Sequence, residues 1–208
     1  GLMVYLALAT VLWGYFSFYR KIPGVSWVDV AVLPRFHRVH QAIGDYYFSE
    51  VKRLWQQGSY AQSVMTGRAA VLKNPRKLES RLFLADCWIL AGRPDEAIRM
   101  LKEGLEYQPG DRGLQMKLVA ACQAAGRSRD LLKILRSDFP AHGVRVLNER
   151  VFQIAEVEAS LDVEGPDSAQ ALASGYAGFE QDPVAAPTLA KIDWDQNQPE
   201  KAFSRLGV

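Results

Sequence analysis

Apolar residues recur every three or four positions in the stretch 94–105, which reads PDEAIRMLKEGL. The helix predicted there has one apolar face, made of Ala97, Ile98, Leu101 and Leu105. Gly92 suits the left-handed residue that ends a preceding helix, and Pro94 suits the first turn of the next one. Pro109 and Gly110 stop the second helix. The pattern therefore predicts a helix end, a tight turn and a second helix.

The same pattern returns with a fixed spacing. Gly58, Gly92 and Gly126 are equally spaced along the chain, and Pro75 and Pro109 are separated by the same interval. A repeat of about 34 residues is typical of a solenoid, in which each helix pair buries its apolar face against its neighbours. We expect three such units, at 44–77, 78–111 and 112–145.

The middle unit follows a pattern of large, small and proline positions with Leu84, Ala85, Trp88, Ala97, Leu101, Gly104 and Pro109. It resembles a tetratricopeptide repeat, a helix–turn–helix of about 34 residues. Arg81 stands where that family usually has an aromatic residue. The first unit matches at Tyr47, Leu54, Tyr60, Ala70 and Pro75 and departs at Glu50 and Gly67. The third matches at Leu118, Cys122, Gly126 and Leu135 and departs at Leu131, Asp138 and Gly143. The resemblance implies an all-α fold, a right-handed solenoid of antiparallel helix pairs.

Residues 146–208 contain weaker, degenerate copies of the helix pair. One copy is expected at 147–183, with helices over 148–161 and 168–178. Another is expected at 184–208, where Gln198-Pro199-Glu200 matches Arg93-Pro94-Asp95. The last residues do not form the polar capping helix that solenoids need, so we expect further chain or a covering partner at that end.

Residues 1–19 carry no charged side chain. An apolar run of about 20 residues is what a helix needs to cross a bilayer, and aromatic residues gather at its end as in an interfacial belt. We expect a transmembrane anchor over 1–21, formed by Leu2, Val4, Leu6, Leu8, Val11, Leu12, Trp13, Tyr15, Phe16 and Phe18. A cleaved signal peptide is the alternative, but bulky residues follow the run where a cleavage site needs small ones. A buried core helix, the other alternative, usually shows a polar face.

A linker and the start of the first long helix are expected at 22–43. Pro23 and Gly24 end the anchor helix, and Pro34 can start a helix at Arg35 that runs to Gln57. The apolar segment 25–33 could lie at the membrane interface, dock on a partner, or pack on the first repeat as a plain linker.

Charge adds little beyond the anchor's orientation. Basic residues outnumber acidic ones at 20–44, which favours a cytoplasmic solenoid by the positive-inside rule. The chain has 25 basic and 23 acidic residues, a net charge of +2, so nucleic acid is not expected as a partner. Cys87 and Cys122 lie in apolar helical contexts, and we expect them to be buried rather than joined in a disulfide framework.

No spacing in the sequence matches a phosphate-binding loop, a nucleophile elbow or a zinc-binding His-Glu-x-x-His. His37 and His40 share a helix face, but neighbouring arginines repel a cation and no third ligand is evident. Glu156 and Glu158 are two residues apart and point to different helix faces. We therefore expect no catalytic residue, no metal site and no cofactor.

The resemblance also implies a binding surface, because the first helices of successive units line a groove that grips peptides in that family. Position by position, the wall of this groove would be Phe48, Lys52, Trp55, Leu82, Phe83, Asp86, Ile89, Met116 and Lys117. The subgroup that clamps a C-terminal carboxylate needs several fixed polar residues, of which only Lys117 is present. A largely apolar wall usually marks a partner surface. The alternative is that these residues pack on the linker or on a neighbouring repeat.

These features predict a non-catalytic, single-pass membrane protein whose repeats bind other proteins, as a scaffold or assembly subunit of a membrane complex. Its partners would be proteins of that complex and, through the N-terminal helix, the lipid bilayer. Two alternatives stay open. One is an adaptor for soluble clients at the membrane, in chaperoning or secretion, and the other is an accessory region of a longer regulatory protein.

Overall fold

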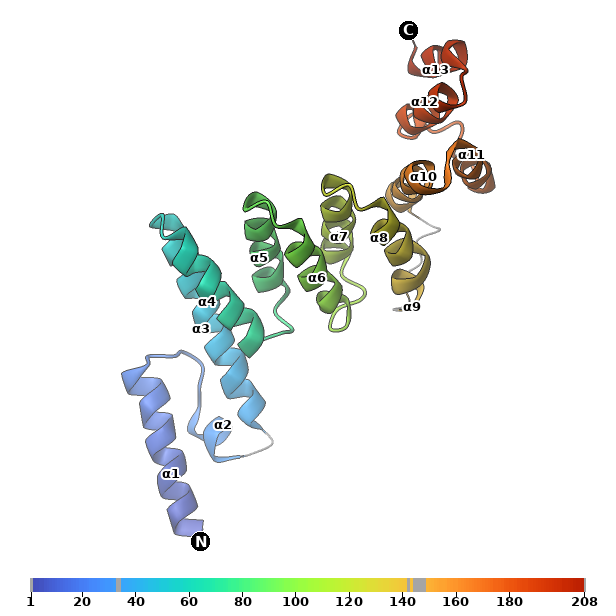
Figure 1. Cartoon of the computed structure of the whole chain (residues 1–208). Coiled ribbons are helices and arrows are strands. Elements are labelled where there is room, and N and C mark those ends of the chain that lie inside the picture. The colour runs from blue at the N-terminus through green and yellow to red at the C-terminus, as the bar shows by residue number, and fades with distance from the viewer. Residues whose placement is uncertain (1, 33–34, 142, 144–148, 208) are drawn as a thin grey trace. The chain divides into compact units, whose positions relative to one another are not determined.

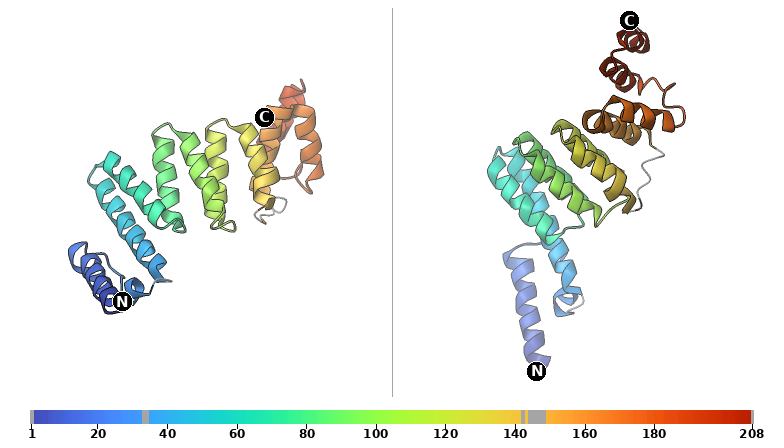
Figure 2. Two further views of the ribbon diagram at one scale, coloured as in Figure 1. Left: turned by 60° about the horizontal axis from the view of Figure 1, so that its bottom comes forward. Right: turned by 45° about the vertical axis from the view of Figure 1, so that its right-hand side comes forward.

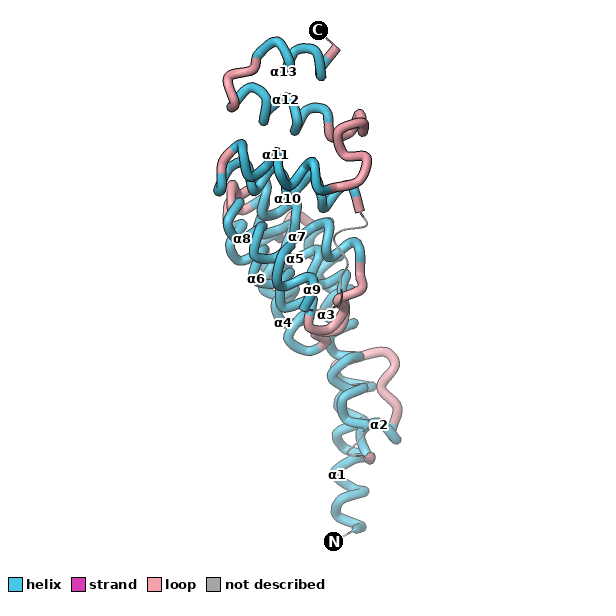
Figure 3. The backbone as a smooth tube through the Cα atoms, turned by 90° about the vertical axis from the view of Figure 1, so that its right-hand side faces the viewer, coloured by secondary structure: helices cyan, strands magenta, loops and turns pink. Residues whose placement is uncertain are grey.

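The computed structural model describes residues 2–32, 35–141, 143 and 149–207. Within these residues every regular element is a helix, and Figure 3 shows the helices joined by loops and turns. The all-α fold expected from the sequence is confirmed. The chain divides into two compact units, 1–107 and 108–208.

Unit 1 contains an N-terminal layer followed by two helix pairs. The layer is α1 (Leu2–Gly14), the π-helical turn η1 (Tyr15–Tyr19) and the short helix α2 (Trp27–Ala31). The pairs are α3 (Phe36–Gln56) with α4 (Tyr60–Lys73), and α5 (Leu78–Leu90) with α6 (Pro94–Leu105). In Figures 1 and 2 the two helices of each pair lie side by side and run in opposite directions.

The turns inside the helix pairs are closed by left-handed residues. Gly58, Gly92 and Gly126 have φ of +76°, +68° and +62°, a region that glycine adopts without strain. The chain reverses at all three, so the turn pattern read from the sequence is confirmed. The last pair uses Asn197 at φ +65° instead, since asparagine tolerates this region better than other side chains do.

The helix pairs of unit 1 approach each other at small residues. Ala85 and Ala97 are completely buried, as the repeat pattern predicts. In α4, Gly67 is buried and a Cβ atom there would lie 3.5 Å from Leu84 Cδ1. The Ser63 hydroxyl donates a hydrogen bond to the Val51 carbonyl at 2.9 Å, which satisfies a buried polar group.

The N-terminal layer packs against the first half of α3. Ala9 of α1, Val30 of α2, and Val39 and Ile43 of α3 belong to one apolar cluster. The α2 helix begins with a capping box, in which Ser26 and Asp29 satisfy each other's backbone amides. The described part of the segment 25–33 therefore packs within unit 1, whereas Pro34 lies outside the described residues.

Unit 2 continues with further helix pairs. The first pair is α7 (Arg112–Ala124) with α8 (Ser128–Lys133), and α8 extends through the π-helical turn η3 (Ile134–Asp138) into α9 (Phe139–Ala141). The next pairs are α10 (Arg150–Glu164) with α11 (Pro166–Gly175), and α12 (Ala186–Asp195) with α13 (Pro199–Leu206). Residue 148, the expected start of a helix, lies outside the described residues.

The predicted bounds of the helix at 168–178 are wrong at both ends. It begins at Pro166, because proline suits a first helical turn, and it ends at Gly175. Beyond it the chain turns inward, and Tyr176 and Phe179 join the apolar cluster of Val157, Ala173, Leu189 and Ile192. The need to bury these two rings ends the helix early.

Candidate partner-binding surface

Three aromatic side chains of the predicted groove come together in unit 1. Phe48 and Trp55 lie on α3, and Phe83 lies on α5. The ring centroid of Phe83 is 6.2 Å from that of Phe48 and 5.3 Å from that of Trp55, edge to face in both cases. Edge-on aromatic pairs add stability beyond burial alone. These rings therefore join the two helix pairs of unit 1 as well as lining the expected wall.

Phe48 itself offers little surface to a partner. Its side chain is buried, with 6% of the residue exposed. The ammonium groups of Lys52 and Lys77 lie 4.8 Å and 5.4 Å from its ring centroid, within cation–π range. At this end of the predicted wall the exposed group is Lys52, and the ring beneath it belongs to the core.

The other residues of the predicted wall are partly exposed. Leu82, Asp86 and Ile89 share α5 with Phe83. Met116 and Lys117 lie on α7 in unit 2. The structure thus gathers the α3 and α5 members of the wall in unit 1, and the α7 members belong to the other unit.

Unit 1 also has an open apolar recess of about 480 Å³, which no pattern in the sequence indicates. It lies between α4 and α5 at the end of α3, and it is lined by Trp55, Tyr60, Ala61, Val64, Met65, Arg68, Cys87, Trp88, Leu90 and Ala91. Burial raises the pKa of the Cys87 thiol, which is therefore a neutral part of the recess lining. In the sequence, Met65 and Leu90 look like ordinary apolar residues of a helix.

Trp88 is half-buried and lies between two arginines. The guanidinium carbon of Arg93 is 4.9 Å from its ring centroid, and that of Arg68 is 5.9 Å away. In the repeat pattern Trp88 stands at one of the large-residue positions. Its position between two cations also makes it the boundary between the apolar recess and a charged surface.

Arg81, which departs from the repeat pattern, has a structural role. It is 3% exposed and donates hydrogen bonds to the carbonyls of Pro75 at 3.0 Å and Met100 at 3.1 Å. Its guanidinium also lies 5.2 Å from the ring centroid of Tyr107. A buried arginine needs such partners, so Arg81 joins the loop before α5 to the middle of α6.

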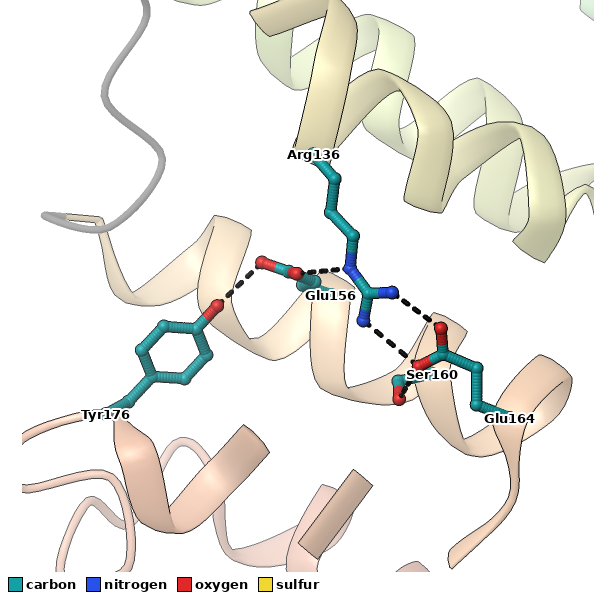
Figure 4. Close-up of polar contacts among 5 residues, drawn as sticks. All are labelled: Arg136, Glu156, Ser160, Glu164 and Tyr176. Carbon is teal, nitrogen blue, oxygen red and sulfur yellow. Dashed lines mark hydrogen bonds and ion pairs between the residues drawn. The ribbon is translucent and has the colours of Figure 1, made fainter. Parts of the chain in front are cut away.

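Buried Glu156 and exposed Glu164 of unit 2 also serve the structure. Figure 4 shows Arg136 bound to two carboxylates of α10, with Nε 2.8 Å from Glu156 and Nη1 2.6 Å from Glu164. The Tyr176 hydroxyl donates to Glu156 at 2.6 Å, and the Ser160 hydroxyl donates to Glu164 at 2.7 Å. The hydrogen bonds that Glu164 accepts from Arg136 and, to a lesser extent, from Ser160 lower its pKa to about 2.

Glu158 faces different partners from Glu156, as expected from their spacing. It accepts hydrogen bonds from Gln123 and Thr188, both at 3.0 Å. Asp193, which is completely buried, pairs with Lys201 at 2.8 Å and with Arg205. Among the described residues, no group of three or more His, Cys, Asp or Glu side chains could hold a metal ion.

The N-terminal helical stretch Leu2–Tyr19 is long and apolar enough to cross a membrane, and a signal sequence would pass the same test. Of the residues expected to form the anchor, the exposed ones are Leu2, Val4, Leu8, Val11, Leu12, Tyr15 and Phe18. Leu6, Trp13 and Phe16 are partly covered, the last two by the apolar cluster around α2 and α3. One side of the helix therefore packs within unit 1, and the other side is apolar and exposed.

Comparison with known proteins identifies the repeats. The family model described as "Tetratricopeptide repeat" matches residues 54–127. Among curated proteins, no sequence gives a significant match.

Two crystal structures of MamA have similar folds. One has a TM-score of 0.55 and 12% identity over 84% of this chain and 90% of that one. The other has a TM-score of 0.54 and 12% identity over 74% and 89%. TTC0263, a thermophilic tetratricopeptide repeat protein of Thermus thermophilus, gives a TM-score of 0.49 and 18% identity over 78% of this chain and 87% of that one. With so low an identity, the likeness to MamA shows the fold alone.

The matched residues run from the end of α3 to the turn after α7, and they include the glycine turns and the small-residue contacts that the repeat pattern predicts. Repeats of this kind are generally scaffolds for protein–protein interaction. The helix pairs within residues 54–127 are tetratricopeptide repeats.

Proposed function

We propose that this chain is a non-catalytic, single-pass membrane scaffold that holds a subunit of a membrane complex through the predicted groove. The observation that carries the proposal is the joint presence, in unit 1, of protein-binding repeats and an apolar helix whose outer side is exposed. Met3 is 81% exposed and Phe18 71% exposed, values that are unfavourable in water for side chains of this size. A bilayer would cover them.

The anchor also reduces the affinity that the groove needs for its membrane partners. A binding surface fixed to a membrane meets other membrane proteins at a high effective concentration, so that weak contacts become sufficient. The basic flank of Arg20 and Lys21 supports a cytoplasmic position for the repeats. A cysteine placed at exposed Gln62 would be shielded from an impermeant thiol reagent in intact cells and labelled after lysis.

Co-purification from a mild detergent tests the proposal. The full chain is expected to bring down membrane proteins in stoichiometric amounts, as identified by mass spectrometry. Ile89→Glu, which places a charge on the predicted wall, is expected to remove them. Val184→Glu, at a side chain of unit 2 that is 66% exposed, is the matched control.

The outcomes separate the alternatives. Recovery of soluble clients in place of membrane subunits would favour the adaptor. Equal recovery with the Ile89 and Val184 variants would remove the predicted groove from the function, provided that both variants melt like the parent protein.

A further inference from the structure

The apolar recess of unit 1 is open and its rim is exposed. Tyr60 is 56% exposed, Met65 68% and Leu90 77%. These side chains come from the start of α4 and the end of α5, and with Trp88 they form one continuous lining. Exposed apolar side chains gathered in this way are unusual on a protein surface unless something covers them.

Positive charge lies next to this recess. A second, more polar recess of about 390 Å³ adjoins it and shares Arg68 and Trp88 with it. The acids there already have partners, since Glu96 pairs with Arg93 and Glu103 lies 3.6 Å from Arg81. Arg68 and Arg99 are exposed and form no ion pair within the described residues. An occupant therefore meets an apolar surface bordered by two uncompensated cations.

The distance from the anchor favours a protein over lipid as the occupant. The part of α3 that packs near α1 includes Val39 and Ile43, whereas Trp55 lines the recess at the other end of the helix. The N-terminal layer reaches Tyr47, whose hydroxyl accepts a hydrogen bond from Arg20 at 3.2 Å, and the helix rises roughly 12 Å from there to Trp55. In this packed arrangement the recess therefore lies beyond the part of α3 that the N-terminal layer covers.

We propose that this recess binds an acidic amphipathic helix of a partner protein. Apolar side chains at successive turns of that helix fill the space around Trp88 and Leu90, and its carboxylates pair with Arg68 and Arg99. The mode of binding is a helix in a groove. The site lies outside the predicted wall, with which it shares only Trp55, and so it adds a second partner to the proposed function.

A pair of designed peptides tests the proposal on the full chain in nanodiscs of neutral phosphatidylcholine. The first peptide has leucine at i, i+3, i+4 and i+7 and glutamate elsewhere, and the second has lysine in place of every glutamate. Fluorescence anisotropy of labelled peptide is expected to show about tenfold tighter binding of the acidic peptide. Empty nanodiscs measure any binding to lipid.

The double variants Arg68→Glu/Arg99→Glu and Met65→Glu/Leu90→Glu are each expected to weaken binding of the acidic peptide about tenfold or more. The matched control is Arg129→Glu/Lys133→Glu, which makes the same charge change at exposed residues of α8 and should leave binding unchanged. All four basic residues are exposed, so a loss of fold is not expected. Circular dichroism checks this for each variant.

Three results would overturn the proposal. The first is equal binding of the two peptides, or no binding at all. The second is binding that the recess variants do not change. The third is a different occupant of the recess. Binding of anionic vesicles through Arg68 and Arg99 would identify lipid, and dimerisation of this chain through Leu90 in the absence of peptide would identify a second copy. Ile89→Glu should leave peptide binding intact, so this site and the predicted groove can fail separately.

Discussion

Gly67 in α4 and Gly44 in α3 are both buried inside helices. A Cβ atom at Gly67 would lie 3.5 Å from Leu84 and 3.8 Å from Val51, which is ordinary van der Waals contact. A Cβ atom at Gly44 would lie 2.5 Å from Asn74 Cβ and 2.8 Å from the Asn74 amide nitrogen. The first site has room for a methyl group and the second has none.

We predict that alanine has opposite effects at these two positions. Gly67→Ala should raise the free energy of unfolding by about 0.5–1 kcal/mol, because alanine favours the helix and its methyl group fits. Gly44→Ala should lower it by about 1–3 kcal/mol, because α4 must move away from α3. Urea unfolding followed by circular dichroism measures both. A shift in the same direction for both variants would contradict this account of helix spacing.

The Arg136–Glu164 pair predicts a pH dependence. The pKa of Glu164 falls from 4.5 to about 2 in the folded chain, so this group stabilises the fold above its unfolded pKa. The stabilisation is lost as the pH drops from about 4.5 toward 2. Glu164 is 35% exposed, so solvent screening keeps the effect modest.

Melting temperatures of the parent protein and Glu164→Gln across this range measure the effect. The parent protein should be the more stable near neutral pH, and the difference should shrink toward zero in acid. Glu106→Gln, which removes one exposed carboxyl group elsewhere, is the control. A difference that stays constant with pH would refute the assignment.

At the level of helices and loops, one polar position in the repeat ties the preceding loop to its helix. Arg81 of α5 donates to the Pro75 carbonyl at 3.0 Å, and Gln115 of α7 donates to the Pro109 carbonyl at 2.5 Å. Both donors stand at the same distance in sequence from their proline, and the two positions are one repeat length apart. An arginine in one repeat and a glutamine in the next therefore donate to the carbonyl of the equivalent proline.

We predict a graded response at Arg81. Arg81→Ala should lower the free energy of unfolding by about 2–3 kcal/mol, since it leaves buried carbonyls without a donor and removes packing on Tyr107. Arg81→Gln should cost about half as much, because glutamine can keep the bond to Pro75 as Gln115 does with Pro109. Chemical unfolding compares the two. If glutamine were no better than alanine, the shared role of the two positions would be wrong.

Helix and turn positions in the repeats could be predicted because they depend on local chemistry. Pro94 and Gly92 act within a few residues of their own backbone, and the structure confirms both. Arg81 looked like a defect in the pattern, because its partners Pro75 and Met100 come together only after α5 packs on α6. The early end of α11 was likewise hidden, because it depends on where the Tyr176 and Phe179 rings are buried.

The residues of the predicted wall could be named from the sequence, whereas the burial of Phe48 and the exposure that forms the recess could not. Phe48, Trp55 and Phe83 were named from repeat positions, and they do come together. The burial of Phe48 beneath Lys52 and Lys77 could not be predicted, since Lys77 lies at the far end of the same repeat, in the loop before α5. Leu90 carries no pattern that separates an exposed apolar residue from a buried one. Its 77% exposure depends on neighbours that only the assembled helices define.

On the scale of the whole molecule, membrane insertion of α1 competes with its packing on the segment that follows. The two run antiparallel, since Tyr5 donates to the Ala31 carbonyl, Trp27 to Thr10 and Trp13 to the Val25 carbonyl. This pairing places Asp29 beside the first half of α1. Hydrogen bonds from the Ser26 side chain and backbone lower the pKa of Asp29, so it is ionised.

A spanning α1 cannot keep this arrangement, because it would carry the Asp29 carboxylate into the hydrocarbon layer, where charge is strongly disfavoured. We therefore predict that α1 parts from α2 when it enters a bilayer. A cysteine pair at Thr10 and Trp27, whose side chains hydrogen-bond at 3.0 Å, should stay unlinked when membranes are treated with a short bismaleimide crosslinker, which can span the gap left by the indole ring. A pair at Ser128 and Asp162, bonded at 2.8 Å in unit 2, should link. Mass spectrometry after thiol labelling distinguishes the two states, and the native Cys87 and Cys122 are buried and interfere little. If the Thr10–Trp27 pair linked as completely as the control pair, α1 would stay on α2 and contact lipid with its exposed side only. The single-pass anchor would then have to be abandoned.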